Sequence, residues 1–223
     1  MYDRIINLIG IDNFNKIKNS KILLVGVGGV GGFAFETLIR SGFQDITIID
    51  KDIVEITNLN RQLVANLNTI GMPKVEVAVN TAKNINGNIK IKAINEFLSK
   101  DNINELENDF NYIIDACDTL NTKLELIRFA SVNNIKIISS MGVGNRIDAS
   151  RIKITKLNKT SNDPLARNLR KLVKDNNLNS NIPVVYSEEI PYKKGEVDSM
   201  ITSPSVAGIL MVNFIINDII NPS

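Results

Sequence analysis

The chain has 223 residues, which suits one domain with a sizeable core, and its 26 Lys and Arg residues nearly balance its 24 Asp and Glu residues. This balance argues against a protein that coats a polyanion over its whole surface, although it permits a local basic patch. Histidine is absent and cysteine occurs once, at Cys117, which excludes His-based triads, imidazole bases, intramolecular disulfides and cysteine-only zinc sites.

Between residues 21 and 140, short runs of β-branched residues alternate with segments of helical period. We expect strands at Lys21–Val25, Ile46–Ile49, Ile89–Ala93, Tyr112–Ala116 and Ile135–Ser139. We expect helices at Val30–Arg40, Pro73–Asn84, Asn102–Asn108 and Asn121–Asn133. This alternation predicts an α/β fold with a Rossmann-like, mostly parallel sheet flanked by helices.

After residue 140 the character of the chain changes. We expect a half-exposed strand at Arg151–Leu157, a basic helix at Asp163–Lys174 and a final helix at Ser205–Ile220. Residues 175–203 look irregular, because Pro183, Pro191 and Gly195 mark turns. We therefore predict a single domain over residues 1–223, in which a core at 21–140 carries a C-terminal extension at 141–223 with a mixed sheet.

The sequence gives no indication of a membrane protein or an exported one. The N-terminus, Met1 to Arg4, is charged and is not followed by an apolar core. The longest apolar stretch, Val206 to Ile216, is about half the length of a membrane span and contains Asn213, so we expect a buried helix. Together with the single cysteine, these features favour a protein of the reducing cytoplasm.

The pattern Gly26-x-Gly28-x-x-Gly31 lies between an expected strand and an expected helix, which is the context in which it binds phosphates. These glycines, with Gly29 among them, let the backbone approach phosphates closely, and the helix N-terminus supplies free N–H groups. Asp50 follows Gly31 by 19 residues, at a strand end where a carboxylate can accept from ribose hydroxyls. We interpret this as a nucleotide loop; the alternative is a tight turn without a ligand, and the loop alone does not separate NAD from ATP.

A second polar cluster follows the second expected strand and favours ATP. Asp52 and Asn58 extend the nucleotide-binding set, and Arg61 and Lys74 add charge that a nicotinamide cofactor does not need. ATP that is cleaved between its α and β phosphates develops charge that these two cations can neutralise. Asp118, at the end of the fourth strand, is placed to hold a metal that bridges the phosphates. Taken singly, each residue is more often a solvated side chain or a cap; taken together they predict ATP and Mg²⁺.

Several motifs resemble the adenylating domain shared by ubiquitin-activating enzymes and their bacterial relatives in thiamin and molybdopterin synthesis, the ThiF/MoeB/HesA group. They are the glycine loop, Asp50-x-Asp52, Asn58-x-Asn60-Arg61-Gln62, Gly71-x-Pro73-Lys74 and Asp115-x-x-Asp118. Members of this family adenylate a carboxylate with ATP and Mg²⁺ and release pyrophosphate.

The resemblance implies a role for each matching residue. Asp50 would hold the ribose, and Asn58, Arg61 and Lys74 would contact the phosphates. Asp118 would hold the metal, so Arg61, Lys74 and Asp118 are expected to be catalytic.

The family also passes an arginine from the neighbouring subunit into the site. Tyr2-Asp3-Arg4 matches that position, which makes Arg4 a candidate catalytic finger and implies a homodimer. The alternative is that Arg4 is a mobile terminal charge.

The cysteine content narrows the choice of acceptor. The sulfur-carrier branch of the family typically has two Cys-x-x-Cys zinc pairs plus a reactive cysteine, whereas this chain has Cys117 alone. At a strand end, Cys117 is expected to be a small apolar filler. Thioester or persulfide chemistry on a carrier protein is therefore disfavoured.

Four further stretches resemble the branch called tRNA threonylcarbamoyladenosine dehydratase. They are Ser140–Asp148, Lys159–Arg167, Val185–Glu189 and Pro204–Gly208, and the similarity covers nearly the whole chain. The resemblance implies that ATP activates the carboxylate of the threonylcarbamoyl group on adenosine at position 37 of tRNA. A ring then closes and AMP is released, which is a net dehydration without a protein nucleophile.

A basic stretch supports an RNA substrate independently. Between Arg151 and Asp175 there are eight basic residues against two acidic ones. The RNA-binding candidates are Lys159, Arg167, Arg170, Lys171 and Lys174, the last four of which share one face of the expected helix. Such a stripe can neutralise phosphates without reading bases, although a solvated helix face has the same pattern.

Three other functions stay open. The first is an adenylating enzyme for the C-terminus of a ubiquitin-like sulfur-carrier protein, and the second is a non-catalytic nucleotide-binding module. An NAD oxidoreductase is a more distant third. Some relatives also employ sulfur-transfer partner proteins. The resemblance therefore makes such proteins possible partners of this chain.

Overall fold

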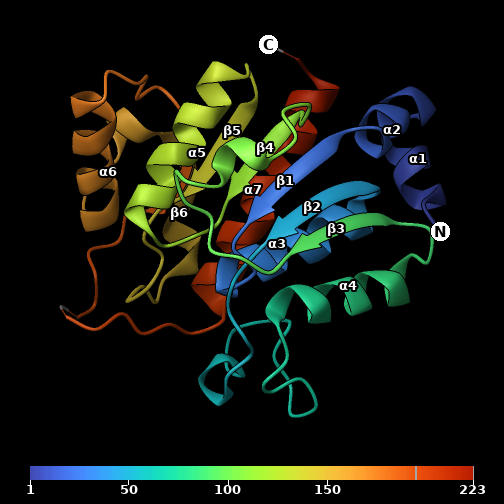
Figure 1. The fold of residues 1–223 in the computed structure, drawn as a ribbon, viewed down its shortest axis with the longest axis horizontal. Helices are drawn as coiled ribbons and strands as arrows, with labels where there is room; N and C mark the ends of the chain where they lie inside the picture. The colour runs from blue at the N-terminus through green and yellow to red at the C-terminus, as the bar shows by residue number, and fades with distance from the viewer. Residues whose placement is uncertain (194, 223) are drawn as a thin grey trace.

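A seven-stranded sheet forms the centre of the protein (Figure 1), whose structure, a computed structural model, describes residues 1–193 and 195–222. The strands are β1 (Lys21–Val25), β2 (Asp45–Ile49), β3 (Lys90–Ile94), β4 (Tyr112–Asp115), β5 (Lys136–Ser140), β6 (Ile152–Lys156) and β7 (Pro183–Ser187). Their order is β3-β2-β1-β4-β5-β7-β6, and every neighbouring pair is parallel except β7 and β6. The predicted α/β class, with a mostly parallel sheet and a mixed extension, is confirmed.

Helices cover both faces of this sheet. They are α1 (Asp3–Ile9), α2 (Ile11–Lys18), α3 (Gly29–Ser41), α4 (Lys74–Ile85), α5 (Leu120–Val132), α6 (Pro164–Asp175) and α7 (Thr202–Ile220). Successive side chains of a strand point to opposite faces, and both faces of β1 are buried. Ile22 and Leu24 belong to the core formed with α3, α4 and α7, whereas Leu23 and Val25 belong to the core formed with α5 and α6. The continuous apolar run in β1 is therefore explained by burial on both sides.

Helix α7 is long and apolar enough to cross a membrane by length and composition. In this fold it packs against α3 in the core, and its buried residues include Ala207, Met211 and Val212. A Cβ at Gly208 would lie 2.3 Å from the carbonyl oxygen of Val30, so glycine is what permits the close approach of the two helices. The expected buried helix is thus observed.

Two sequence-based expectations about secondary structure were wrong. The helix expected at Asn102–Asn108 is only a 3₁₀ turn at Ile103–Glu105. The side chain of Asn102 forms local hydrogen bonds instead, since its Oδ1 accepts from the Ser99 backbone and its Nδ2 donates to the Phe97 carbonyl. Short polar side chains offer the backbone this alternative to a helix.

The second error concerns residues 175–203, which were expected to be irregular. They contain β7, which lies between β5 and β6 and buries Val184, Val185 and Tyr186. Pro183 marked a turn in the sequence, but it occupies the first position of the strand, where a missing N–H is tolerated. The strand expected at Arg151–Leu157 is confirmed, because β6 occupies Ile152–Lys156.

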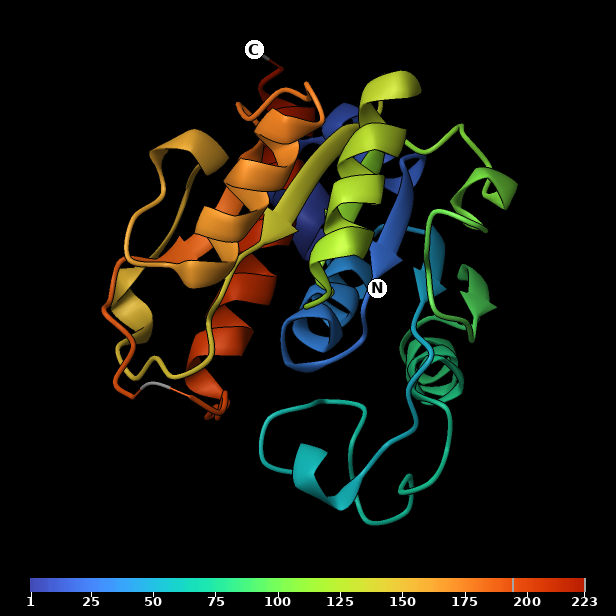
Figure 2. The same cartoon turned by 60° about the vertical axis from the view of Figure 1, so that its left-hand side comes forward.

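Between β2 and α4 the chain leaves the sheet, and residues 51–73 form a projecting lobe (Figure 2). The lobe contains the 3₁₀ turn Ile56–Asn58 and carries several exposed apolar side chains. They are Ile53, Ile56, Leu63, Leu67 and Ile70. The lobe stands at the carboxyl ends of β1 and β2, which is the edge of an open α/β sheet where ligands bind.

Candidate active site

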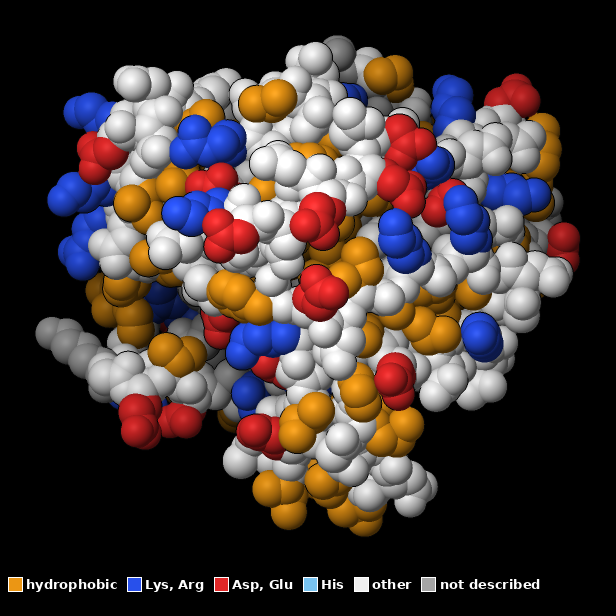
Figure 3. Space-filling model, in the orientation of Figure 1, with side chains coloured by type: hydrophobic (Ala, Val, Ile, Leu, Met, Phe, Trp, Pro, Cys, Tyr) orange, Lys and Arg blue, Asp and Glu red, His pale blue; other side chains and the backbone are white. Residues whose placement is uncertain are grey.

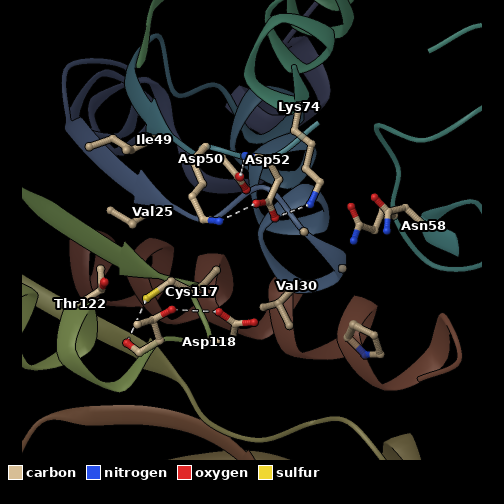
Figure 4. A pocket seen from close by; sticks show the side chains of 18 of the residues that line it. Val25, Val30, Ile49, Asp50, Asp52, Asn58, Lys74, Cys117, Asp118 and Thr122 are labelled. Carbon is tan, nitrogen blue, oxygen red and sulfur yellow. Dashed lines mark hydrogen bonds and ion pairs between the residues drawn. The ribbon is translucent and has the colours of Figure 1, made fainter. Parts of the chain in front are cut away.

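A cavity of about 630 Å³ opens at the carboxyl ends of β1, β2 and β4. Figure 4 shows Asp50, Asp52 and Lys74 on one side of it and Cys117 and Asp118 on the other. The sequence assigned each of these residues except Cys117 to the nucleotide site, so residues from three separate motifs converge on one cavity. The expected residues Gly26, Gly28, Gly29, Asn58 and Arg61 also line it.

The glycine loop is required by the packing of the strand ends. Gly26 has a φ of +91°, and a Cβ there would lie 2.7 Å from the Ala116 carbonyl oxygen. A Cβ at Gly31 would lie 1.8 Å from the Gly26 carbonyl oxygen, so no side chain fits at this position in the first turn of α3. Gly28 borders the cavity, and a Cβ there would meet only Nε2 of Gln62, at a van der Waals distance of 3.8 Å. The loop is therefore fixed by sterics at two glycines and leaves its backbone accessible at a third.

The carboxylate of Asp50 fastens this loop to the end of β2. Its Oδ2 accepts from the Val27 backbone N–H at 2.6 Å, and its Oδ1 accepts from the Asp52 N–H at 2.8 Å. Each carboxylate oxygen can accept further hydrogen bonds, so Asp50 is also able to bind hydroxyl groups. The same side chain thus fixes the loop and keeps acceptor capacity at the cavity wall.

Lys74 is a buried cation at the first position of α4. It is 5% exposed, and its Nζ lies 2.9 Å from Oδ2 of Asp52. Burial alone would raise the pKa of Asp52, but the hydrogen bond and charge of Lys74 outweigh it and hold this pKa below its ordinary value. Lys51 approaches the other oxygen at 3.5 Å. Two cations around one carboxylate leave positive charge available to an anion in the cavity.

Arg61 and Asn58 are held by the lobe. The Nη1 of Arg61 donates to the Thr57 carbonyl at 2.7 Å and to Oδ1 of Asn60 at 3.0 Å, while the side chain stays half-buried. Oδ1 of Asn58 accepts from the Glu55 N–H at 3.1 Å and so closes the 3₁₀ turn. Arg61 keeps guanidinium N–H groups for a ligand, whereas the amide of Asn58 is partly committed to the turn.

Asp118 is exposed at the opposite wall, just after the end of β4. Its contact is with Oγ1 of Thr119 at 3.3 Å. Within residues 1–193 and 195–222, no group of three His, Cys, Asp or Glu side chains could hold a metal. Mg²⁺ bound through one carboxylate, phosphate oxygens and water needs no such cluster, so this site fits Mg²⁺ only together with a nucleotide.

Two buried features were not predicted from the sequence. Lys123 of α5 is fully buried, and its Nζ lies 3.1 Å from both carboxylate oxygens of Asp115 and 2.7 Å from the Ser140 carbonyl. Arg146 is 3% exposed and donates to the Asn162 carbonyl, while its Nε and Nη1 have no partner among the described residues. Burial lowers the pKa of Arg146. A signal for Lys123 existed, because it continues the apolar face of its helix.

Cys117 was expected to fill space as a small apolar side chain, but it also forms hydrogen bonds. Its Sγ donates to Oδ1 of Asp115 at 3.0 Å, and its backbone N–H reaches the same oxygen at 3.3 Å. Burial, and then the negative charge of Asp115, raise the pKa of the thiol well above its ordinary value. The group is held as a thiol, which opposes a nucleophilic role.

Arg4 lies on α1, is exposed, and does not line the cavity of its own chain. The basic candidates divide into two groups. Lys159, Arg167, Lys171 and Lys174 are exposed, and Figure 3 shows basic side chains over the region of α6. Arg170 differs, because it is half-buried and its Nη1 donates to the carbonyls of Thr160 at 3.1 Å and Leu157 at 3.4 Å. Arg170 therefore supports the chain beside α6, contrary to the expectation of four equivalent residues on one solvent face.

A parallel sheet with a glycine loop after its first strand, and with cations and a carboxylate at the strand ends, defines the class of nucleotide-binding α/β proteins. The model of the ThiF family matches residues 2–220. The chain belongs to the ThiF family, as its motifs predicted.

The similar proteins point to one branch of this family. The tRNA threonylcarbamoyladenosine dehydratase of Bacillus subtilis is 34% identical over 95% of this chain and 91% of its own length. The crystal structure of the E. coli tRNA N6-threonylcarbamoyladenosine dehydratase in complex with ATP superimposes with a TM-score of 0.92 at 30% identity, covering 98% of this chain and 93% of that one. A molybdopterin-synthase adenylyltransferase of Haemophilus influenzae is 31% identical over 78% of this chain and 70% of its own length.

Proposed function

We propose that this protein is an ATP-dependent tRNA threonylcarbamoyladenosine dehydratase. It adenylates the carboxylate of the threonylcarbamoyl group on adenosine at position 37 of tRNA and then closes a ring, releasing pyrophosphate and AMP. The observation that carries this proposal is that similarity to such dehydratases continues through the extension at residues 141–223, beyond the nucleotide-binding core at 21–140. We assign the extension to the acceptor and to the dimer.

The ATP half of the reaction uses residues around the cavity. The backbone at Gly28 and Gly29 approaches the phosphates, and Asp50 accepts from the ribose hydroxyls. Arg61 and Lys74 neutralise the charge that develops as the bond between the α and β phosphates breaks. The ion pair of Lys74 with Asp52 holds this buried side chain at the cavity wall.

Asp118 would hold Mg²⁺ at the wall opposite Lys74. When bound, the metal supplies Lewis-acid stabilisation of phosphate oxygens. The fit rests on the exposed carboxylate of Asp118 at the cavity wall, which is an oxygen ligand of the kind that Mg²⁺ prefers.

The acceptor half needs no nucleophile from the protein. A carboxylate oxygen of the substrate attacks the α-phosphorus, and pyrophosphate leaves with the electron pair of the broken P–O bond. A nucleophilic atom of the same threonylcarbamoyl group then attacks the activated carbonyl carbon and loses its proton. AMP leaves with the former carboxylate oxygen, so the substrate has lost one water in total.

We also propose a homodimer in which Arg4 of one subunit serves the cavity of the other. This is supported by the exposure of Arg4 on α1 and by its absence from the lining of its own cavity. The lobe carries exposed apolar side chains such as Ile56 and Leu67. Burial of these side chains against the second subunit would stabilise the dimer. The exposed basic residues of α6 are proposed to bind tRNA phosphates. The protein is proposed to act in the cytoplasm, and sulfur-transfer proteins are candidate partners.

One experiment separates this function from the alternatives. The protein is incubated with ATP, Mg²⁺ and tRNA that carries threonylcarbamoyladenosine, and AMP and the mass of the nucleoside are measured. AMP formation with loss of one water from the nucleoside is expected. AMP formation only with a ubiquitin-like carrier protein would favour a sulfur-carrier enzyme, and no turnover with either acceptor would favour a non-catalytic nucleotide-binding module.

A further inference from the structure

Two chain segments meet at the end of the cavity that lies away from β2. One is the loop Val143–Asn145 after β5, and the other is the segment 195–199, which leads from β7 toward α7. Gly144 and Val197 both line the cavity, and a Cβ at Gly144 would lie 2.2 Å from Cγ1 of Val197. The two segments are therefore packed against each other in its wall.

All four polar groups of Asn145 form hydrogen bonds, and three of them hold this contact through Glu196 and Asp198. Its backbone N–H donates to the Asp198 carbonyl at 2.7 Å, and its carbonyl accepts from the Tyr192 N–H at 2.8 Å. Its side-chain Oδ1 accepts from the Asp198 N–H at 2.8 Å, and its Nδ2 donates to the Glu196 carbonyl at 2.9 Å. Asn145 has a φ of +55°, a conformation that asparagine tolerates better than most residues.

Residues 195–199 are attached a second time, at the loop that carries Asn60 and Arg61. Nδ2 of Asn60 donates to the Ser199 carbonyl at 2.9 Å, and Oδ1 of Asn60 accepts from Arg61 at 3.0 Å. Ser199 lines the cavity as well. Residues 195–199 thus run from the loop after β5 to the loop that carries the phosphate-facing arginine.

We propose that residues 195–199 form the wall against which the acceptor nucleoside binds, and that Asn145 is the positioning residue that holds this wall in place. The inference rests on the proposed function and names the part of the chain that selects its acceptor. Val197 is 77% exposed beside the bare backbone of Gly144, which gives an apolar surface for the face of an unstacked base. Asn60 connects this surface to the phosphate-facing side of the cavity, where the carboxylate must react.

The decisive variant is Asn145→Gly, which keeps the left-handed backbone available and removes only the side-chain hydrogen bonds. We expect the KM for threonylcarbamoyladenosine-tRNA to rise about tenfold, because small misplacements of positioning groups are costly. The affinity for a non-hydrolysable ATP analogue is expected to stay within about twofold. The matched control is Asn134→Gly, at an asparagine with a φ of +56° that lies outside the cavity lining, which should change neither value.

A second pair of variants tests the wall even if Asn145→Gly folds poorly. Gly144→Ala places a methyl group against Val197 and is expected to raise the same KM, whereas adding Val197→Ala removes the clashing atom and restores it in part. An unchanged KM in both Asn145→Gly and Gly144→Ala would overturn the inference, and so would an equal loss of affinity for the ATP analogue. A wild-type protein that forms no cyclised nucleoside would instead overturn the proposed function, and the inference with it, before any variant is compared.

Discussion

The ammonium group of Lys123 lies 3.1 Å from both carboxylate oxygens of Asp115, and both side chains are fully buried. Lys123 comes from α5 and Asp115 ends β4, so the pair joins a helix to a strand at the base of the loop that carries Asp118. Asp115 also accepts from the backbone N–H and the thiol of Cys117. One buried carboxylate therefore positions the chain that leads to the expected metal ligand.

Replacing Lys123 with methionine should destabilise the protein strongly. The variant leaves the Asp115 carboxylate buried without its cation, and breaking a buried pair in this way costs about 3–5 kcal/mol. Urea unfolding monitored by circular dichroism measures the change. The double variant Lys123→Met, Asp115→Asn removes both charges and should recover more than half of the loss. A cost below about 1 kcal/mol for the single variant, which is typical of exposed pairs, would contradict this account.

Cys117 should be unreactive in the folded protein. Burial and the charge of Asp115 raise the pKa of its thiol, so little thiolate exists near pH 8. We expect alkylation at least about tenfold slower than in the urea-unfolded chain. Cys117→Ala should keep most of the cyclisation activity, because the proposed chemistry uses no protein nucleophile. Loss of AMP formation in a folded Cys117→Ala protein would revive the sulfur-carrier alternative.

The stability of the protein should fall in acid partly through Asp218. Burial alone would raise the pKa of Asp218, but hydrogen bonds from Lys136 and Tyr112 outweigh it and hold this pKa below its ordinary value. A lowered carboxyl pKa stabilises the fold above the unfolded value, and this contribution disappears as pH falls through the folded value. Urea unfolding between about pH 5 and pH 2 should therefore show a steeper decline for wild type than for Asp218→Asn. The same substitution at exposed Asp101 should leave the wild-type slope unchanged.

Gly31→Ala should abolish nucleotide binding and destabilise the fold. Its Cβ would lie 1.8 Å from the Gly26 carbonyl oxygen, so the loop must move, at a cost of about 1–3 kcal/mol or more. Titration with an ATP analogue and thermal unfolding measure the two effects. Gly87→Ala is the control, because nothing lies within 4 Å of the added methyl group. A Gly31→Ala variant that still bound the analogue normally would show that the loop does not approach phosphates.

Charge reversal on α6 should weaken tRNA binding in a salt-dependent way. Arg167→Glu with Lys171→Glu removes two exposed cations. The negative slope of the logarithm of the tRNA association constant against the logarithm of the salt concentration should become shallower by about two. Lys18→Glu with Lys83→Glu makes the same charge change on α2 and α4 and should have little effect. Equal effects of the two pairs would mean that α6 contributes only net charge. Arg170 is unsuitable for this comparison, because it bonds the backbone at Thr160.

The sequence predicted the elements whose periodicity was strong and uninterrupted. The strands β1, β2 and β4 and the helices α3, α4 and α5 begin and end within one residue of their expected positions, because burial on both faces or on one face fixes their patterns. The helix predicted at Asn102–Asn108 does not form because a side-chain hydrogen bond competes with it. Strand β7 was missed because Pro183 was interpreted as a turn, whereas a proline can also occupy the first position of a strand. The place of β7 in the sheet is decided by tertiary pairing, whereas the hydrogen bonds of Asn102 are local, and neither effect is visible in the periodicity of apolar residues.

The candidate site followed a similar division. Residues at strand ends, such as Asp50 and Asp118, could be placed together because parallel strands end at one edge. The pair of Lys123 with Asp115 could not, since the partner of a buried charge depends on the packing of a helix on the sheet. The different roles of Arg170 and Arg167 were hidden for the same reason: helical spacing sets a face but not what covers it.

The position of β7 also determines the order in which the sheet can be completed during synthesis. β6 is made before β7, yet β6 joins the sheet only through β7, which pairs with β5 on its other side. A nascent chain that ends before residue 183 therefore has an open edge at β5 and no place in the sheet for β6. The outer part of the extension, including the loop beside Asn145, can reach its final arrangement only once β7 has left the ribosome.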